Sequence, residues 1–220
     1  MDFFLGICFA FLCLVLLTMY RFYQYYTKYQ SLVKDNDSRN RSEHVKIIVM
    51  LDHYRGAELD ARLEATIALY KQLANNNTRV VVLLATGKLM GDEITIALRN
   101  MDTLHAMGIP LSSLDASSGF SGNAADTFQE VRSACEHAKE VFKVTTVHIV
   151  ANPLQAFQAF GIAIFNGIYP QLCVIPLLEE SPAYAVGKFF QGMLTFFDPN
   201  GWNPLSCFIR YKRKNISNTF

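Results

Sequence analysis

The first twenty residues form the most apolar stretch of the chain. From Phe3 to Tyr20 the sequence FFLGICFAFLCLVLLTMY contains no charged residue. As a helix this run extends about 27 Å, at roughly 1.5 Å per residue, which is close to the thickness of the hydrocarbon core of a bilayer. The pattern therefore predicts one N-terminal transmembrane helix within residues 1–22.

A cleaved signal peptide is the alternative interpretation of this segment. It is disfavoured because no Lys or Arg precedes the apolar run and no small-residue cleavage site comes after it. The run leads instead into a mixture of aromatic and basic residues typical of the interfacial belt of a retained helix: Arg21, Tyr23, Tyr25, Tyr26 and Lys28. The sequence then becomes polar, so residues 23–44 are predicted to be a juxtamembrane segment and linker.

Beyond residue 44, short apolar runs alternate with segments of helical period. The apolar runs predict strands: Val45 to Leu51, Arg79 to Ala85, Thr145 to Val150 and Gln171 to Ile175. The segments between them predict helices in residues 59–73, 92–107, 123–140 and 154–165. Such alternation requires crossover connections. Residues 45–182 are therefore predicted to be an α/β domain, a three-layer Rossmann-like fold with a mostly parallel sheet and helices on both faces.

The last part of the chain, residues 183–220, is first aromatic and then basic. Phe189 to Phe197 predicts a helix, FDPNGWNP is a cluster of turn residues, and RYKRK comes after it. We expect this helix and tail to pack on the domain. The basic run is either a solvated terminus or a contact with anionic lipid headgroups.

Charge and cysteine content restrict the function classes. A formal net charge of +1 gives no strong field, so nucleic acid is not an expected partner. The five cysteines are scattered and form no CxxC pair and no Cys/His cluster, which predicts neither a disulfide framework nor a metal site. No cofactor is predicted, because complete P-loop, G-x-S-x-G and H-E-x-x-H motifs are all missing.

Candidate site residues lie after the predicted strands, because ligands of open parallel sheets bind beyond the carboxyl ends of the strands. Asp52 is next to the first strand. The others come after later strands or precede the next helix: Thr86, Gly87, Ser121, Asn123, Asn152 and Gln155. Asp52 and Asp126 are weak candidates for acid-base chemistry, although Asp126 is equally well explained as a residue flanking a helix start.

Five short motifs occur in a characteristic order. The first strand is succeeded by Arg62 and by the triplet at residues 68–70, Ala-Leu-Tyr. The others are Ala-Thr-Gly at 85–87, Gly-Ile-Pro at 108–110, Ser121 with Asn123 and Asp126, and FFDPNG at 196–201. Together with the N-terminal apolar run, this order resembles the SanA/ElyC/YdcF family of bacterial envelope proteins, in particular its SanA-like branch.

The resemblance implies a membrane-anchored α/β domain that supports envelope barrier integrity or envelope polysaccharide and peptidoglycan metabolism. It implies a pocket for a small anionic or nucleotide-like ligand, formed by Arg62, Thr86, Gly87, Ser121, Asn123, Asn152 and Gln155. The late His and Arg of the family are absent, since Gln155 and Gln158 stand at the matching positions. We therefore expect a degenerate pocket without catalysis.

Two other functions stay open at this point. One is an active transferase or hydrolase acting on a nucleotide-linked or lipid-linked substrate. The other is a non-catalytic protein-interaction domain at the membrane. The side of the membrane is also open: the resemblance implies a single-pass protein with its domain outside the cytoplasm, whereas the basic residues after the apolar run favour the cytoplasm.

Overall fold

The computed structural model describes residues 2–39, 45–51, 56–74, 78–85, 95–116, 127–177, 182–198, 200 and 207, with side chains for all of these except 2–8, 10, 36–39, 183 and 184. The helices are α1 (Asp2–Arg39), α2 (Ala57–Ala74), α3 (Ile96–Ala106), α4 (Thr127–Glu140), α5 (Pro153–Phe165) and α6 (Pro182–Phe197), with a short 3-10 turn at Leu111–Ser113. The strands are β1 (Val45–Met50), β2 (Arg79–Leu83), β3 (Leu114–Asp115), β4 (Thr146–Ala151) and β5 (Tyr169–Val174).

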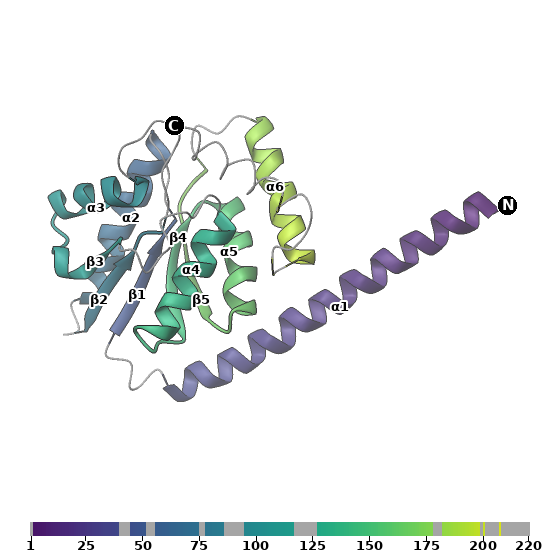
Figure 1. Cartoon of the computed structure of the whole chain (residues 1–220), viewed down its shortest axis with the longest axis horizontal. Helices are drawn as coiled ribbons and strands as arrows, with labels where there is room; N and C mark the ends of the chain where they lie inside the picture. Colours follow the sequence, from purple (N-terminus) through teal and green to yellow (C-terminus); the bar gives the residue numbers. More distant parts are fainter. Residues whose placement is uncertain are drawn as a thin grey trace.

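The strands form one parallel sheet in the order β3-β2-β1-β4-β5. Its two faces carry separate cores. Ile47 and Val49 face α4 and α5, whereas Ile48 and Met50 face α2 and α3. Figure 1 shows the sheet between these helix layers. The predicted α/β class with a parallel sheet is confirmed, and the apolar strands without alternation are explained by burial on both faces.

Two elements of the structure differ from those predicted from the sequence. Strand β3 was not predicted, because its two residues are too short to give a periodic signal. Helix α6 begins at Pro182, well before the predicted start at Phe189.

Helix α1 continues through most of the segment that was interpreted as juxtamembrane residues and linker. Its C-terminal half packs against the domain, whereas its N-terminal half extends away from it (Figure 1). Tyr25 and Leu32 are buried and Tyr29 is half-buried, all in contact with α5 or β5 residues. These positions recur at helical spacing, which gives the segment an apolar face despite its polar composition.

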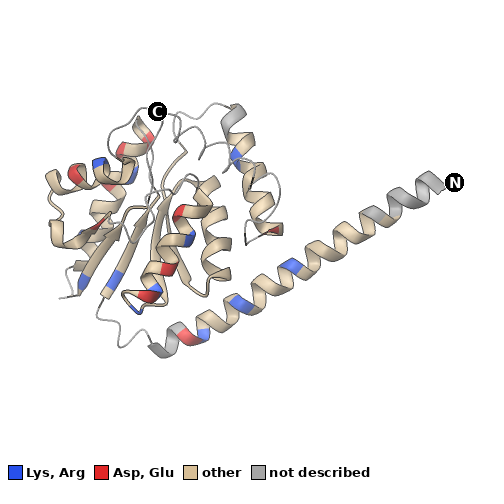
Figure 2. Cartoon of the chain, in the orientation of Figure 1, with Lys and Arg blue, Asp and Glu red and all other residues tan. Residues whose placement is uncertain are grey.

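In Figure 2 the basic positions on α1 all lie in the half that packs against the domain. In the described part of the chain, no helix contains an apolar stretch long enough to cross a membrane. The predicted span at residues 3–20 falls partly on residues 3–8 and 10, whose side chains lie outside the described set.

His148 gives the fold a predicted pH dependence. It lies in the centre of the sheet, opposite Ile48 on β1 and Gln171 on β5. Burial, with a smaller contribution from the positive charge of Lys46, lowers the pKa of His148 to about 4. In the unfolded chain the ordinary pKa is about 6.5, so the unfolded state binds the proton first as the pH falls.

Stability should therefore decrease by roughly 2–3 kcal/mol as the pH falls from about 6.5 to about 4. Urea unfolding at a series of pH values measures this loss in wild type and in His148→Gln. A variant that loses stability over the same window as wild type would contradict the assignment to His148.

Candidate functional site

The sheet has its topological switch point between β1 and β4. The chain leaves β1 for α2 on one face and leaves β4 for α5 on the other face. Ligands of such sheets bind in the crevice at the carboxyl ends of the two strands. Leu51 is the residue directly after β1 and Asn152 is the residue directly after β4, so these residues mark the edge where a site is expected.

A buried ion pair lies under this edge. Glu58 and Arg62 stand four residues apart at the start of α2, and their side chains are 2% and 0% exposed. The Arg62 guanidinium donates hydrogen bonds to Glu58 Oε1, to the carbonyl of Leu51 and to Gln155 Oε1. Arg62 therefore joins the end of β1 to the start of α5.

Asn152 joins the same ion pair to β4. It is the N-cap of α5: its Oδ1 accepts from the backbone N–H of Gln155 at 2.8 Å. Its Nδ2 donates to Glu58 Oε1 at 2.9 Å, and the Asn152 side chain is fully buried. Pro153 at the first helical position has no N–H to lose and fixes the backbone angle that begins the helix.

The start of α4 reaches the same edge. Gln155 Nε2 donates to Oγ1 of Thr127, the first residue of α4, at 3.3 Å. On the other side Lys188 of α6 places its Nζ 3.5 Å from the same Oγ1. The N-termini of α4 and α5 carry partial positive charge, and Lys188 adds a full one, whereas Glu130 in the first turn of α4 adds a negative charge. The helix N-termini nevertheless present backbone N–H groups of the kind that bind anions.

The structure brings together three of the predicted ligand-binding residues, Arg62, Asn152 and Gln155. All three are buried, and they form hydrogen bonds with other groups of the protein. This geometry supports a positioning role for them, beneath the start of α4, where Thr127 is itself only 3% exposed and Lys188 approaches its Oγ1. Six other predicted residues lie outside the described residues, in the segments after β1, β2 and β3: Asp52, Thr86, Gly87, Ser121, Asn123 and Asp126.

Sequence reasoning missed Glu58, Thr127 and Lys188. The spacing of Glu58 and Arg62 gave a usable signal, because charges four residues apart on a helix are neighbours. Thr127 was passed over inside the motif that contains Asn123 and Asp126. Lys188 had no signal, because only the packing of α6 brings it to the sheet edge.

The cysteine on α4 is a packing residue. Cys135 is fully buried on α4, and burial raises the pKa of its thiol to about 12, so the thiol stays protonated at neutral pH. Within the described ranges, no three His, Cys, Asp or Glu side chains are grouped to hold a metal ion.

Comparisons with known proteins give no match: neither the family models, nor the curated proteins, nor the solved structures contain one that is similar to this chain.

Proposed function

We propose that this protein is a membrane-attached α/β domain that binds a small anionic ligand at the sheet edge between β1 and β4. One observation carries the proposal: the N-termini of α4 and α5 meet Lys188 directly above a buried polar network. The network holds Gln155 and Thr127 in place, so the cationic surface is preorganised before the ligand arrives.

Binding without catalysis is the better supported form of this function. The Glu58 carboxylate is 2% exposed and is bonded by Arg62 and Asn152, so it is not presented to a substrate. Gln155 and Gln158 replace the His and Arg of the SanA/ElyC/YdcF family, and both are buried in hydrogen bonds. An active transferase or hydrolase using Asp52 and Asp126 is the alternative, and activity that is lost in the Asp52→Ala, Asp126→Ala double variant would favour it.

Membrane attachment is proposed from the uncharged run of residues 3–20 and from the exposed apolar side chains along it. Phe9, Phe11 and Met19 are each 65% exposed or more, which is costly in water and favourable in lipid. In line with the resemblance, we propose that the domain lies on the non-cytoplasmic side. Protease added to spheroplasts, whose outer envelope has been opened, should digest the domain, and complete protection that is lost only after lysis would contradict this side.

Ligand binding is expected to raise the melting temperature of the full chain. With inorganic pyrophosphate, ADP or a sugar nucleotide at about 100 times its Kd, the rise should be about 5–10 °C, which corresponds to roughly 2.7 kcal/mol. Lys188→Ala should abolish most of the rise, because it removes the cation beside Thr127. Differential scanning fluorimetry in detergent measures the rise in melting temperature in wild type and in Lys188→Ala.

Lys139→Ala is the matched control, because Lys139 lies in the last turn of α4, away from its N-terminus, and bonds to the carbonyl of Asn166. Lys139→Ala should show the same ligand-dependent rise in melting temperature as wild type. An equal loss in both variants would show unspecific charge attraction, and no rise with any anion would contradict the proposal.

The cellular role is proposed to be support of the envelope barrier, as the family resemblance implies. Cells that lack the gene should become sensitive to a large antibiotic or to detergent. The wild-type gene should restore resistance, whereas the Lys188→Ala gene should not. An unchanged barrier in the deletion strain would count against this role.

A further inference from the structure

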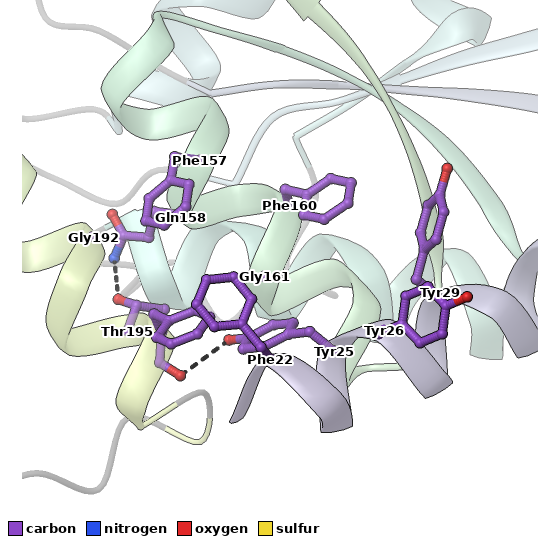
Figure 3. A pocket seen from close by; sticks show the side chains of 11 residues that line it. Phe22, Tyr25, Tyr26, Tyr29, Phe157, Gln158, Phe160, Gly161, Gly192 and Thr195 are labelled. Carbon is purple, nitrogen blue, oxygen red and sulfur yellow. Dashed lines mark hydrogen bonds between the residues drawn. The ribbon is translucent and has the colours of Figure 1, made fainter. Parts of the chain in front are cut away.

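An apolar groove of about 290 Å³ lies between α1, α5 and α6. Figure 3 shows its walls: Phe22 and Tyr25 come from α1, Phe157 and Phe160 from α5, and Gly192 from α6. The volume is close to the lower end of cavities that hold small ligands. The groove is separate from the proposed anion site at the β1–β4 edge, because it lies on the outer side of α5.

Two glycines that line the groove leave room in it because they have no side chain. A Cβ added at Gly161 would lie 3.0 Å from Tyr25 Oη, and one at Gly192 would lie 3.2 Å from Phe157 Cδ1. Neither glycine has the positive φ that would require glycine for backbone reasons. Their effect is therefore steric: any larger side chain at these positions would narrow the groove.

Three polar side chains of the groove, Tyr25, Gln158 and Thr195, form hydrogen bonds with protein partners. Gln158 Nε2 donates to Thr195 Oγ1 at 2.9 Å, and Tyr25 Oη donates to the carbonyl of Phe196 at 3.4 Å (Figure 3). The described residues that line the groove include no charged side chain. Water would find few hydrogen-bond partners there, so an apolar occupant is favoured.

The surroundings of the groove indicate which apolar occupant it takes. Phe22 and Phe157 at its rim are 62% and 51% exposed, and Phe22 continues the exposed apolar surface of residues 11–20. Phe189 and Phe190 on α6 are also more than half exposed. Exposed aromatic and aliphatic side chains of this kind are typical of segments that lie at a membrane interface.

A cation lies beside the groove. Arg21 precedes Phe22 and is close enough to Tyr25 for its charge to lower the pKa of Tyr25, against the larger effect of burial, which raises it. The guanidinium donates to Gln24 Oε1 at 2.9 Å on the same helix. A second copy of the chain would bring the same positive charge, whereas a phospholipid brings a complementary phosphate.

We propose that the groove holds one acyl chain of a phospholipid whose phosphate lies near Arg21 at the bilayer surface, so that this chain leaves the bilayer and lies along α1, between α5 and α6. The proposal needs α1 to meet a bilayer, and it is independent of the anion site at the sheet edge. Bound lipid would fix the angle between α1 and the domain, because it fills the space between α1 and the two helices it faces.

The test uses the full chain in vesicles of phosphatidylcholine and phosphatidylglycerol that contain a phosphatidylcholine with a photoactivatable acyl chain. After illumination, mass spectrometry locates the lipid adducts. Adducts are expected on residues 157–161 of α5 and 192–196 of α6, in addition to those on residues 9–20 of α1. In Gly192→Leu the adducts on α5 and α6 should fall by about tenfold, because the leucine side chain occupies the groove.

Gly187→Leu is the matched control, since Gly187 lies on the same helix and a Cβ there would meet nothing within 4 Å. Gly187→Leu should give the same lipid adducts on α5 and α6 as wild type. A circular-dichroism melt establishes that Gly192→Leu is folded, and Gly192→Ala, with a smaller side chain, should give an intermediate loss. Adducts on α5 and α6 that persist in Gly192→Leu would overturn the proposal.

The photolabelling experiment distinguishes failure of the groove proposal from failure of membrane attachment. Adducts on α1 without adducts on α5 and α6 would remove the groove proposal alone. The absence of all adducts would overturn the groove proposal and membrane attachment together, and would leave the anion site to be judged by its own melting experiment.

Discussion

Arg62→Ala is expected to lower the free energy of unfolding by about 3–5 kcal/mol, because it leaves the Glu58 carboxylate charged and buried without the Arg62 cation. The variant also removes a donor from the carbonyl of Leu51 and from Gln155, so the ends of β1 and α5 lose a common partner. Urea unfolding monitored by circular dichroism measures the change.

The chain contains a matched control for this prediction. Arg132 and Glu136 form an ion pair with the same four-residue spacing, at 2.8 Å, but each side chain is 47% exposed. Arg132→Ala should therefore lower the free energy of unfolding by less than about 1 kcal/mol. The double variant Arg62→Leu, Glu58→Leu should be more stable than Arg62→Ala, since it removes both charges of the buried pair. Equal losses for Arg62→Ala and Arg132→Ala would contradict the buried network.

Asn152→Ala is expected to lower the free energy of unfolding by about 2–5 kcal/mol. The loss of the N-cap of α5 contributes about 0.5–2 kcal/mol, and the loss of the hydrogen bond to the charged Glu58 contributes about 1.5–3 kcal/mol. Because both groups are buried, water does not replace the missing amide. The same urea experiment measures this change.

Thr95→Ala separates the two contributions. Thr95 caps α3 by accepting from the backbone N–H of Leu98 at 3.2 Å, and this contact is exposed. Thr95→Ala should lower the free energy of unfolding only by the contribution of the cap, about 1 kcal/mol. If Asn152→Ala costs no more than Thr95→Ala, the hydrogen bond from Asn152 to Glu58 contributes nothing and the network is not held together at β4.

The fold could be predicted because its signals are local. Apolar runs such as Ile47 to Leu51 and the helical period of α2 each lie within one element, and right-handed crossovers then restrict the arrangement to a parallel sheet. The length of α1 could not be read in the same way. Residues 23–39 have the composition of a linker, and only the tertiary contacts of Tyr25 and Leu32 reveal a packed face.

The candidate site was predictable in its position more than in its chemistry. The rule for strand ends located Asn152 and Gln155 correctly at the carboxyl edge. The rule suggested ligand contacts for Asn152 and Gln155, and the family resemblance suggested one for Arg62, whereas all three are buried in bonds with one another or with Glu58. Burial depends on how α2, α5 and β1 pack together, which no single segment encodes. Lys188 and the apolar groove depend equally on packing between distant segments.

The most direct measurement of anion binding at the β1–β4 edge is amide NMR of the full chain during titration with inorganic pyrophosphate. The largest shifts should occur at the starts of α4 and α5, at Thr127, Phe128, Leu154 and Gln155, and Lys188→Ala should remove them. Shifts confined to other parts of the chain, or unchanged by Lys188→Ala, would contradict a ligand site at this edge.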